Sequence, residues 1–117
     1  MNLENKIALI TGSTRGIGKS IAKLFVQNGA TVIICGRNIE NSKKTIEEIA
    51  CETNVDKEKM FPIDLDISNK ESIKTAVDKV IKKYNRIDIL INNAGITSNV
   101  SLLDSTNICP ITDTKDV

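Results

Sequence analysis

Histidine and tryptophan are absent from this 117-residue sequence, and aromatic side chains make up only 3% of it. Histidine is the commonest metal ligand and the side chain used most often for general acid–base catalysis. A histidine-based catalytic or metal site is therefore excluded. The only tyrosine is Tyr84.

Cysteine is also scarce, and neither sign of charge dominates. The three cysteines, Cys35, Cys51 and Cys109, are widely spaced and odd in number, which does not fit a disulfide framework or a zinc site. We expect reduced thiols in a cytoplasmic protein, with no bound metal. The formal net charge is only +1, so the composition gives no electrostatic reason to expect binding to nucleic acid.

Long hydrophobic runs are lacking as well. Residues 1–10 carry charges within the first six positions and only a short apolar run. Neither a signal peptide nor a transmembrane span is therefore expected, and a membrane partner is not expected either. With 40% hydrophobic and 26% charged residues, the composition is that of an ordinary soluble domain with a modest core.

What the sequence does contain is a regular alternation of strand-like and helix-like segments. Short apolar or β-branched runs predict strands, and apolar residues spaced at i, i+4, i+7 and i+8 predict helices. The expected strands cover residues 6–11, 31–35, 59–64 and 87–92, and the expected helices cover residues 16–28, 39–51 and a segment that opens at Ser68. This order predicts an α/β fold, a truncated Rossmann-type doubly wound parallel sheet of about four strands in the order 3-2-1-4.

Some details of these elements can also be predicted. Pro62 interrupts the third strand, which suits a position at the edge of the sheet. Ser68 and Glu71 have the spacing of a capping box. The apolar rows expected to face the core are Ile17, Ile21, Leu24 and Phe25 in the first helix, and Ile73, Val77, Val80, Ile81 and Tyr84 in the third.

The stretch TGSTRGIGKS, residues 11–20, connects the first strand to the first helix. A Walker A loop also ends in Gly-Lys-Ser, but it needs a glycine five places before Gly18, where Ser13 stands. Gly12, Gly16 and Gly18 fit a dinucleotide-binding loop better, because they allow a tight turn and close approach of the backbone to a pyrophosphate. The helix N-terminus would add N–H donors and partial positive charge. A P-loop and an ordinary strand-to-helix turn remain the alternatives.

The end of the second strand indicates which dinucleotide would bind. Sites for NAD usually carry Asp or Glu about 20 residues past the loop, whereas this sequence reads Cys35-Gly36-Arg37-Asn38. Arg37 can hold a 2′-phosphate instead, and Arg15 in the loop can reach the same group. The predicted cofactor is therefore NADP(H), with two solvated surface arginines as the alternative interpretation.

The motif TGSTRGIG, together with NNAG at residues 92–95, resembles the short-chain dehydrogenase/reductase family. Within that family the likeness is closest to reductases of 3-oxoacyl thioesters carried on acyl carrier protein, and it covers roughly residues 3–98. The resemblance implies an NADPH-dependent oxidoreductase of fatty acid biosynthesis. It also implies an acyl-carrier-protein thioester as the substrate of the full-length relatives, and oligomers in the family.

The resemblance implies roles for individual residues too. The loop from Gly12 to Gly18 would hold the pyrophosphate, Arg37 the 2′-phosphate and Asp64 the adenine, although Asp64 also suits a simple turn. Asp88 and Asn92 would brace the sheet. The implied cofactor-binding residues are Gly12, Ser13, Thr14, Arg15, Gly16, Ile17, Gly18, Arg37, Asp64, Leu65, Asn93, Ala94 and Gly95.

The catalytic residues of the family have no counterpart in this sequence. The family uses a tyrosine to protonate the developing alkoxide and a lysine four residues later to lower the pKa of that tyrosine. The residue four places after Tyr84 is Asp88, so no catalytic residue is assigned.

Two regions follow from the resemblance and the composition. Residues 1–98 are expected to form the NADP-binding Rossmann region. Residues 99–117 are polar, contain Pro110 and have no sustained helical period, so an irregular or disordered tail is expected. We expect an N-terminal fragment of a reductase that is inactive alone and does not assemble into the oligomers of the family. A non-enzymatic NADP(H)-binding module and half of a split enzyme are the alternatives.

Overall fold

Four parallel strands form the centre of the computed structural model, which describes residues 1–93. The sheet order is β3-β2-β1-β4, as the sequence predicts. The strands are β1 (Ile7–Ile10), β2 (Thr31–Gly36), β3 (Met60–Asp64) and β4 (Ile89–Ile91). The predicted tail, residues 99–117, and the site residues Ala94 and Gly95 lie outside the described residues.

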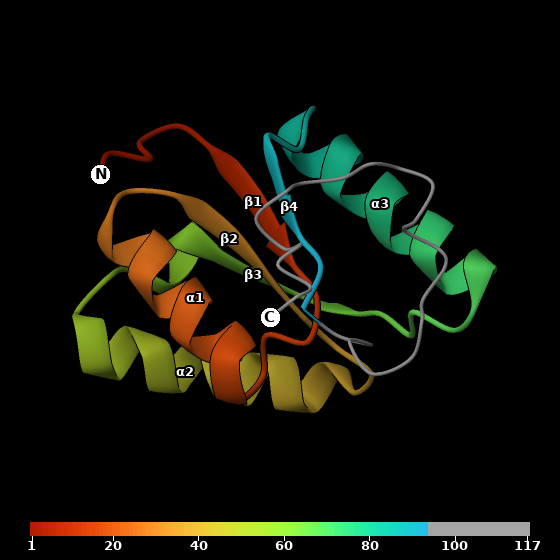
Figure 1. Ribbon diagram of the computed structural model, residues 1–117, viewed down its shortest axis with the longest axis horizontal. Coiled ribbons are helices and arrows are strands. Elements are labelled where there is room, and N and C mark those ends of the chain that lie inside the picture. Colours follow the sequence, from red (N-terminus) through yellow and green to blue (C-terminus); the bar gives the residue numbers. More distant parts are fainter. Residues whose placement is uncertain (94–117) are drawn as a thin grey trace.

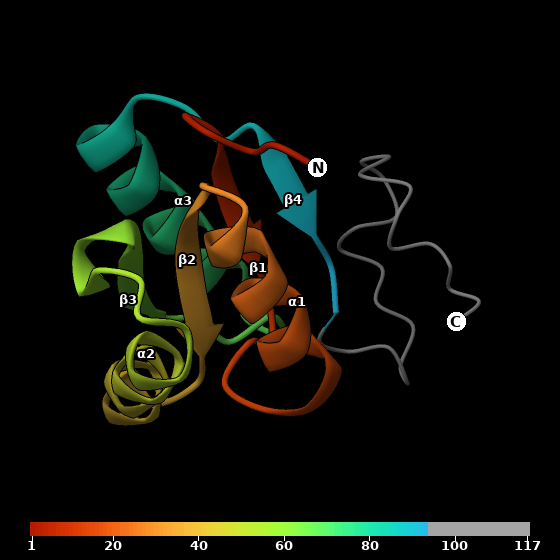
Figure 2. The ribbon, with the colours of Figure 1, turned by 90° about the vertical axis from the view of Figure 1, so that its left-hand side faces the viewer.

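Within residues 1–93, three α-helices cover the two faces of the sheet (Figure 1, Figure 2). They are α1 (Gly16–Gln27), α2 (Ile39–Thr53) and α3 (Lys70–Tyr84), and the short 3₁₀ helix η1 (Lys57–Lys59) precedes β3. α1 and α2 lie on one face and α3 on the other (Figure 2). This arrangement explains why the strands are apolar on both sides, since a parallel sheet covered on both faces has no side that faces water. None of the helices within residues 1–93 has both the length and the apolar character needed to cross a membrane.

Side chains of alternate residues in the central strands pack into two separate hydrophobic cores, one on each face of the sheet. On the side of α1 and α2, strand residues such as Ile10 and Ile34 pack with Ile49 of α2. On the side of α3, Leu9 and Ile33 pack with Val80. Every one of these side chains is buried, so the sheet is held from both faces.

The buried side of α1 differs from the predicted one. Gly18, Ala22 and Val26 are buried, whereas Ile17 is 69% exposed and Leu24 is 48% exposed. The expected row of large apolar residues was therefore wrong for these two positions. The reason is steric, because small side chains let the helix approach the sheet closely, and periodicity arguments give the most weight to large apolar residues.

Two details of α3 also correct the sequence analysis. The N-cap is Asn69, whose side chain accepts hydrogen bonds from the N–H groups of Glu71 and Ser72 at 2.9 and 3.1 Å. The expected capping box at Ser68 was wrong, since the Ser68 hydroxyl instead donates to Asp66 at 2.6 Å. Ile81, expected in the core, is 40% exposed.

The third strand lies at the edge of the sheet, as Pro62 predicts. β3, which contains Pro62, lies at one edge and pairs with β2 alone among the described strands. Proline has no N–H to donate and is tolerated there. Among the described strands, β4 forms the opposite edge and pairs with β1.

Asp88 joins the beginnings of β1 and β4, as its expected bracing role requires. Its carboxylate accepts the Ile7 N–H at 2.8 Å, and its own N–H donates to the Ile7 carbonyl at 2.8 Å. Arg86 donates to the same carboxylate at 2.9 Å. The backbone hydrogen bond from Ile7, together with Arg86, holds the pKa of Asp88 below its ordinary value.

Candidate functional site

The carboxyl ends of the four described strands lie side by side at one end of the sheet, because the strands are parallel. In open α/β sheets, ligands bind just beyond this carboxyl end, at the point where the strand order reverses direction. Here the reversal falls between β1 and β4. The predicted site residues from Gly12 to Gly18 follow β1, and Arg37 follows β2. Asp64 ends β3, and Asn93 lies just beyond β4.

The glycines of the loop after β1 are needed for two distinct reasons. Gly12 and Gly16 have φ of 62° and 60°, a region in which side chains are strained. Gly18 lies inside α1 and is needed for close contact instead. A Cβ on Gly18 would lie 2.2 Å from the Gly12 carbonyl oxygen and 2.7 Å from Nδ2 of Asn93. The turn and the start of α1 are thus packed directly against each other.

Ser13 fixes the loop to the end of β2. Its N–H donates to the Cys35 carbonyl at 3.0 Å, and its hydroxyl accepts the Cys35 N–H at 2.8 Å. The side chain is fully buried, so it acts on the position of the loop and does not face solvent. Burial raises the pKa of the neighbouring Cys35 thiol far above its ordinary value, which keeps this thiol protonated and unreactive.

Thr11 and Asn93 tie the loop to the end of β4. The Asn93 N–H donates to the Thr11 hydroxyl at 2.8 Å, and Nδ2 of Asn93 donates to the Gly12 carbonyl at 3.2 Å. The Thr11 hydroxyl also lies 3.4 Å from Oδ1 of Asn92. The predicted site residues Gly12 and Asn93, which are far apart in the sequence, are therefore in direct contact.

Two threonines of the site escaped the sequence analysis. Thr11 is one, and Thr45 of α2 is the other, with its hydroxyl 3.2 Å from the Thr14 carbonyl and 2.9 Å from the Asn41 carbonyl. Thr45 is buried on a helix that is otherwise largely polar. A signal for Thr11 exists, since it is the polar residue that ends an apolar strand next to the glycine-rich loop. Nothing local distinguishes Thr45 from a surface threonine.

The N-terminus of α1 differs from those of α2 and α3. Asn38 caps α2 and Asn69 caps α3 through their side chains, and each helix has a glutamate in its first turn. In α1 the N-cap is Arg15, no side chain of the described residues caps it, and its first turn has no acidic residue. Its N–H groups and partial positive charge therefore suit an anion.

The space beside this helix end suits a phosphate as well. A Cβ built on Gly16 would have no atom within 4 Å, so the backbone of the loop is open to a ligand at this point. The donors, the charge and the open approach together fit the pyrophosphate of a dinucleotide.

The residues predicted to hold the adenosine lie at the ends of β2 and β3. Gly36 is paired in register with Asp64, and the Leu65 N–H donates to the Gly36 carbonyl at 2.7 Å. A Cβ on Gly36 would lie 2.7 Å from the Thr14 side chain, so the loop meets the end of β2 here. The exposed residues Arg15 and Arg37 each directly follow one member of this contact.

Asp66 lies near Arg37 on this side of the site. Hydrogen bonds from Ser68 lower the pKa of Asp66 most, and the positive charge of Arg37 contributes further. Arg37 thus already has an acidic neighbour, which an incoming phosphate would meet as a competing anion.

Tyr84 lies away from the carboxyl ends of the strands. It ends α3, and its ring makes an edge-to-face contact with Phe61, with 6.0 Å between the centroids. Partial burial raises the pKa of its hydroxyl. The tyrosine therefore packs beside the core on the α3 face, as the sequence predicts.

The sheet order, the glycine-rich turn and the bare helix end define a Rossmann-like dinucleotide-binding fold. The sequence model of the short chain dehydrogenase family matches residues 6–114, and the chain belongs to this family. This membership favours the dinucleotide loop over the P-loop alternative.

Three related proteins illustrate the likeness. The 3-oxoacyl-[acyl-carrier-protein] reductase FabG of Thermotoga maritima is 43% identical over 88% of this chain and 40% of its own length. The N-domain of a bacterial malonyl-CoA reductase, solved with NADP, has a TM-score of 0.77 and 34% identity, and the match covers 80% of this chain and 17% of that one. L-Sorbose reductase of Gluconobacter frateurii, solved with NADPH and L-sorbose, has a TM-score of 0.73 and 28% identity, over 92% and 40% of the two chains. The chain spans between about a third and two fifths of the length of the curated relatives it matches.

Proposed function

We propose that this chain is the NADP(H)-binding part of a short-chain ketoreductase that acts on 3-oxoacyl thioesters. The observation that carries the proposal is the pair Arg15 and Arg37 beside the contact between Thr14 and Gly36, with no acid at the end of β2. Guanidinium groups make strong, paired hydrogen bonds to phosphate, and the 2′-phosphate is what distinguishes NADP(H) from NAD(H). The substrate class rests on the likeness to the FabG reductases.

Different residues of the candidate site would bind different parts of the cofactor. Backbone N–H groups at the start of α1 would hold the pyrophosphate, Arg15 and Arg37 the 2′-phosphate, and Asp64 with Leu65 the adenine. Asn93, Ala94 and Gly95 would line the ribose next to the nicotinamide. When bound, NADPH supplies a hydride for a substrate carbonyl, and the role of this part of the fold is to hold and orient the donor.

Replacement of Arg37 tests the cofactor assignment. We expect Arg37→Ala to weaken NADPH binding by about 1.5–3 kcal/mol, because a charged hydrogen bond to the 2′-phosphate is lost. NADH lacks this phosphate, so its affinity should stay within about twofold. Isothermal titration of both cofactors measures the two effects.

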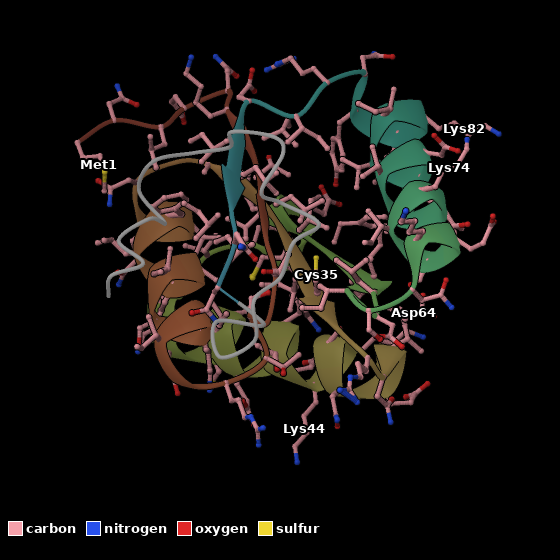
Figure 3. The ribbon with its side chains drawn as sticks, turned by 45° about the vertical axis from the view of Figure 1, so that its right-hand side comes forward. Met1, Cys35, Lys44, Asp64, Lys74 and Lys82 are labelled. Atoms are coloured by element: carbon pink, nitrogen blue, oxygen red, sulfur yellow. The ribbon has the colours of Figure 1, made fainter. Side chains whose placement is uncertain are left out.

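A matched control is Lys82→Ala, which also removes one positive charge. Lys82 lies near the end of α3, far from Asp64 and the carboxyl ends of the strands (Figure 3). It should change neither affinity. Equal losses of NADPH and NADH affinity in Arg37→Ala would refute the assignment of the 2′-phosphate to this arginine.

A second candidate function is a module that binds NADP(H) and has no reductase activity. The observation that favours it is the absence of Tyr-x-x-x-Lys from the 117 residues. The two functions make the same prediction for cofactor binding. They differ in whether a protein that contains this chain turns over a carbonyl substrate.

A further inference from the structure

The buried side of α2 carries two hydroxyl groups among its apolar residues. Ser42 and Thr45 lie three residues apart, which places them on one side of the helix, and both are buried. The Ser42 hydroxyl donates to the carbonyl of Ile63 in β3 at 3.4 Å, and the Thr45 hydroxyl lies 3.2 Å from the Thr14 carbonyl. Buried hydroxyls need hydrogen-bond partners, and these two partners belong to segments that carry predicted cofactor-binding residues.

The Thr45 hydroxyl has two acceptors within reach but only one hydrogen to donate. The Asn41 carbonyl, at 2.9 Å, precedes Thr45 by four residues in α2, so it is also the regular acceptor of the Thr45 N–H. The Thr14 carbonyl lies in the loop after β1, and within residues 1–93 the Thr45 hydroxyl is the one group that donates to it. The contact with Asn41 is therefore local to the helix, whereas the contact with Thr14 joins α2 to the loop.

The contact with Thr45 acts on a different part of the loop from the other contacts described above. One of those joins Ser13 to the end of β2, and another joins the turn to the end of β4. They hold the turn and the start of α1, where backbone N–H groups would meet the pyrophosphate. The Thr14 carbonyl belongs instead to the peptide that leads into Arg15. The Thr45 hydroxyl therefore fixes the point from which the Arg15 side chain starts.

Thr14 also packs against the residue that precedes Arg37. A Cβ built on Gly36 would lie 2.7 Å from Cγ2 of Thr14 and 3.6 Å from Oγ of Ser42. Gly36 is thus in close contact with both the loop and α2, and Arg37 directly follows it. The distance between the two exposed arginines, one after Thr14 and one after Gly36, therefore depends on where the Thr14 peptide is held.

We propose that Thr45 is a positioning residue that determines cofactor specificity, because its hydroxyl holds the peptide before Arg15 so that Arg15 and Arg37 converge on one phosphate. The proposal rests on the proposed function, in which these two arginines bind the 2′-phosphate of NADP(H). Thr45 acts through the loop and not by contact with the cofactor, since its side chain is buried and both of its acceptors are protein carbonyls.

A purely structural role for Thr45 makes a different prediction. A hydroxyl that bonds only within its own helix contributes to stability and leaves the ratio of NADPH to NADH affinity unchanged. Thr53 is such a case on the same helix, about two turns further along. Its hydroxyl donates to the Ile49 carbonyl at 2.7 Å and accepts the Val55 N–H at 3.1 Å. The two threonines can therefore be compared directly.

Removal of the Thr45 hydroxyl tests the proposal. Thr45→Val keeps the β-branched shape and removes the donor. We expect the NADPH affinity to fall about three- to tenfold, as for the loss of one hydrogen bond, and the NADH affinity to change by less than about twofold. Isothermal titration of the 117-residue chain with each cofactor measures the ratio. Thr45→Ser keeps the hydroxyl and should restore most of the NADPH preference.

Thr53→Val is the matched control, because the same substitution on the same helix removes a hydroxyl that contacts only its own helix and the residues just after it. It should lower the stability in urea and leave the affinity ratio unchanged. Thr45→Ala is a second variant without the hydroxyl and should lower the ratio as Thr45→Val does, whether or not valine disturbs the packing. In an Arg15→Ala background, Thr45→Val should change the ratio by less than about twofold, because the side chain that it positions is gone.

The same titrations separate this proposal from the proposed function. Suppose that the unmodified chain prefers NADPH and that Arg37→Ala removes the preference. If Thr45→Val then leaves the ratio unchanged, or lowers both affinities equally, the positioning role is overturned and the cofactor assignment stands. An effect of Thr45→Val on the ratio that persists in full without Arg15 also overturns the role. If the unmodified chain shows no preference for NADPH, the cofactor assignment fails, and the positioning role fails with it.

Discussion

At the scale of single residues, Gly18 shows how one missing side chain joins the loop to the helix. Alanine is normally favoured over glycine inside a helix by about 1 kcal/mol. Here the added Cβ would lie 2.2 Å from the backbone oxygen of Gly12, a contact that only a shift of the loop or of α1 could relieve. Overpacking of this kind costs about 1–3 kcal/mol, so the steric effect outweighs the helix propensity.

We therefore predict that Gly18→Ala destabilises the fold and displaces the loop. The free energy of unfolding in urea should fall by up to about 2 kcal/mol, the difference between the two effects. NADPH affinity should fall with it, since the loop would move. Ser20→Ala, at an exposed position of the same helix, is the control and should not lower the stability. A Gly18→Ala variant as stable as the unmodified chain would show that α1 can move away at no cost.

At the scale of elements, α3 offers a direct comparison of two possible caps. Asn69 accepts two N–H groups of the first turn, whereas Ser68 bonds to Asp66. We predict that Asn69→Ala lowers the free energy of unfolding by about 1 kcal/mol, the usual effect of losing a side-chain N-cap. Ser68→Ala should change it by no more than about 0.5 kcal/mol. Urea denaturation followed by circular dichroism measures both, and equal losses would restore the capping box that the sequence suggested.

The elements also show what a sequence can and cannot predict. The strands, their order and the edge position of Pro62 follow from local patterns, since a strand buried on both faces must be apolar throughout. The buried side of α1 could not be predicted, because its apolar pattern contains two candidate sides. The choice depends on how closely the sheet approaches, and Ala22 is wholly buried while Ile17 is not.

The candidate site divides in the same way. The glycines of the loop can be predicted from their spacing, and so can Arg37 from its place after β2. The contacts between Thr11 and Asn93 and between Thr45 and Thr14 join residues 82 and 31 positions apart in the sequence. They depend on the register of the strands and the placement of α2, which no local pattern contains.

At the scale of the whole molecule, the candidate site lies at the carboxyl ends of the strands, and the only tyrosine lies near their amino ends. The site occupies the carboxyl ends of the strands. α3 starts after the carboxyl end of β3 and runs back to end at Tyr84, near the start of β1 and β4 (Figure 1). The Tyr84 ring packs on Phe61, and burial raises the pKa of its hydroxyl, which makes it a weaker acid at neutral pH.

We therefore predict that the 117-residue chain alone does not reduce an acetoacetyl thioester, even when it binds NADPH. A positioned general acid contributes about 10²- to 10⁴-fold in rate, and the chain offers no Tyr-x-x-x-Lys to supply one. The loss of NADPH absorbance with time, with and without the thioester, measures the activity, and the two rates should be equal. If thioester-dependent turnover does occur, Tyr84→Phe identifies its source. Loss of turnover in that variant would mean that Tyr84 reaches the substrate, contrary to its packing here, and unchanged turnover would point to another acid in the chain.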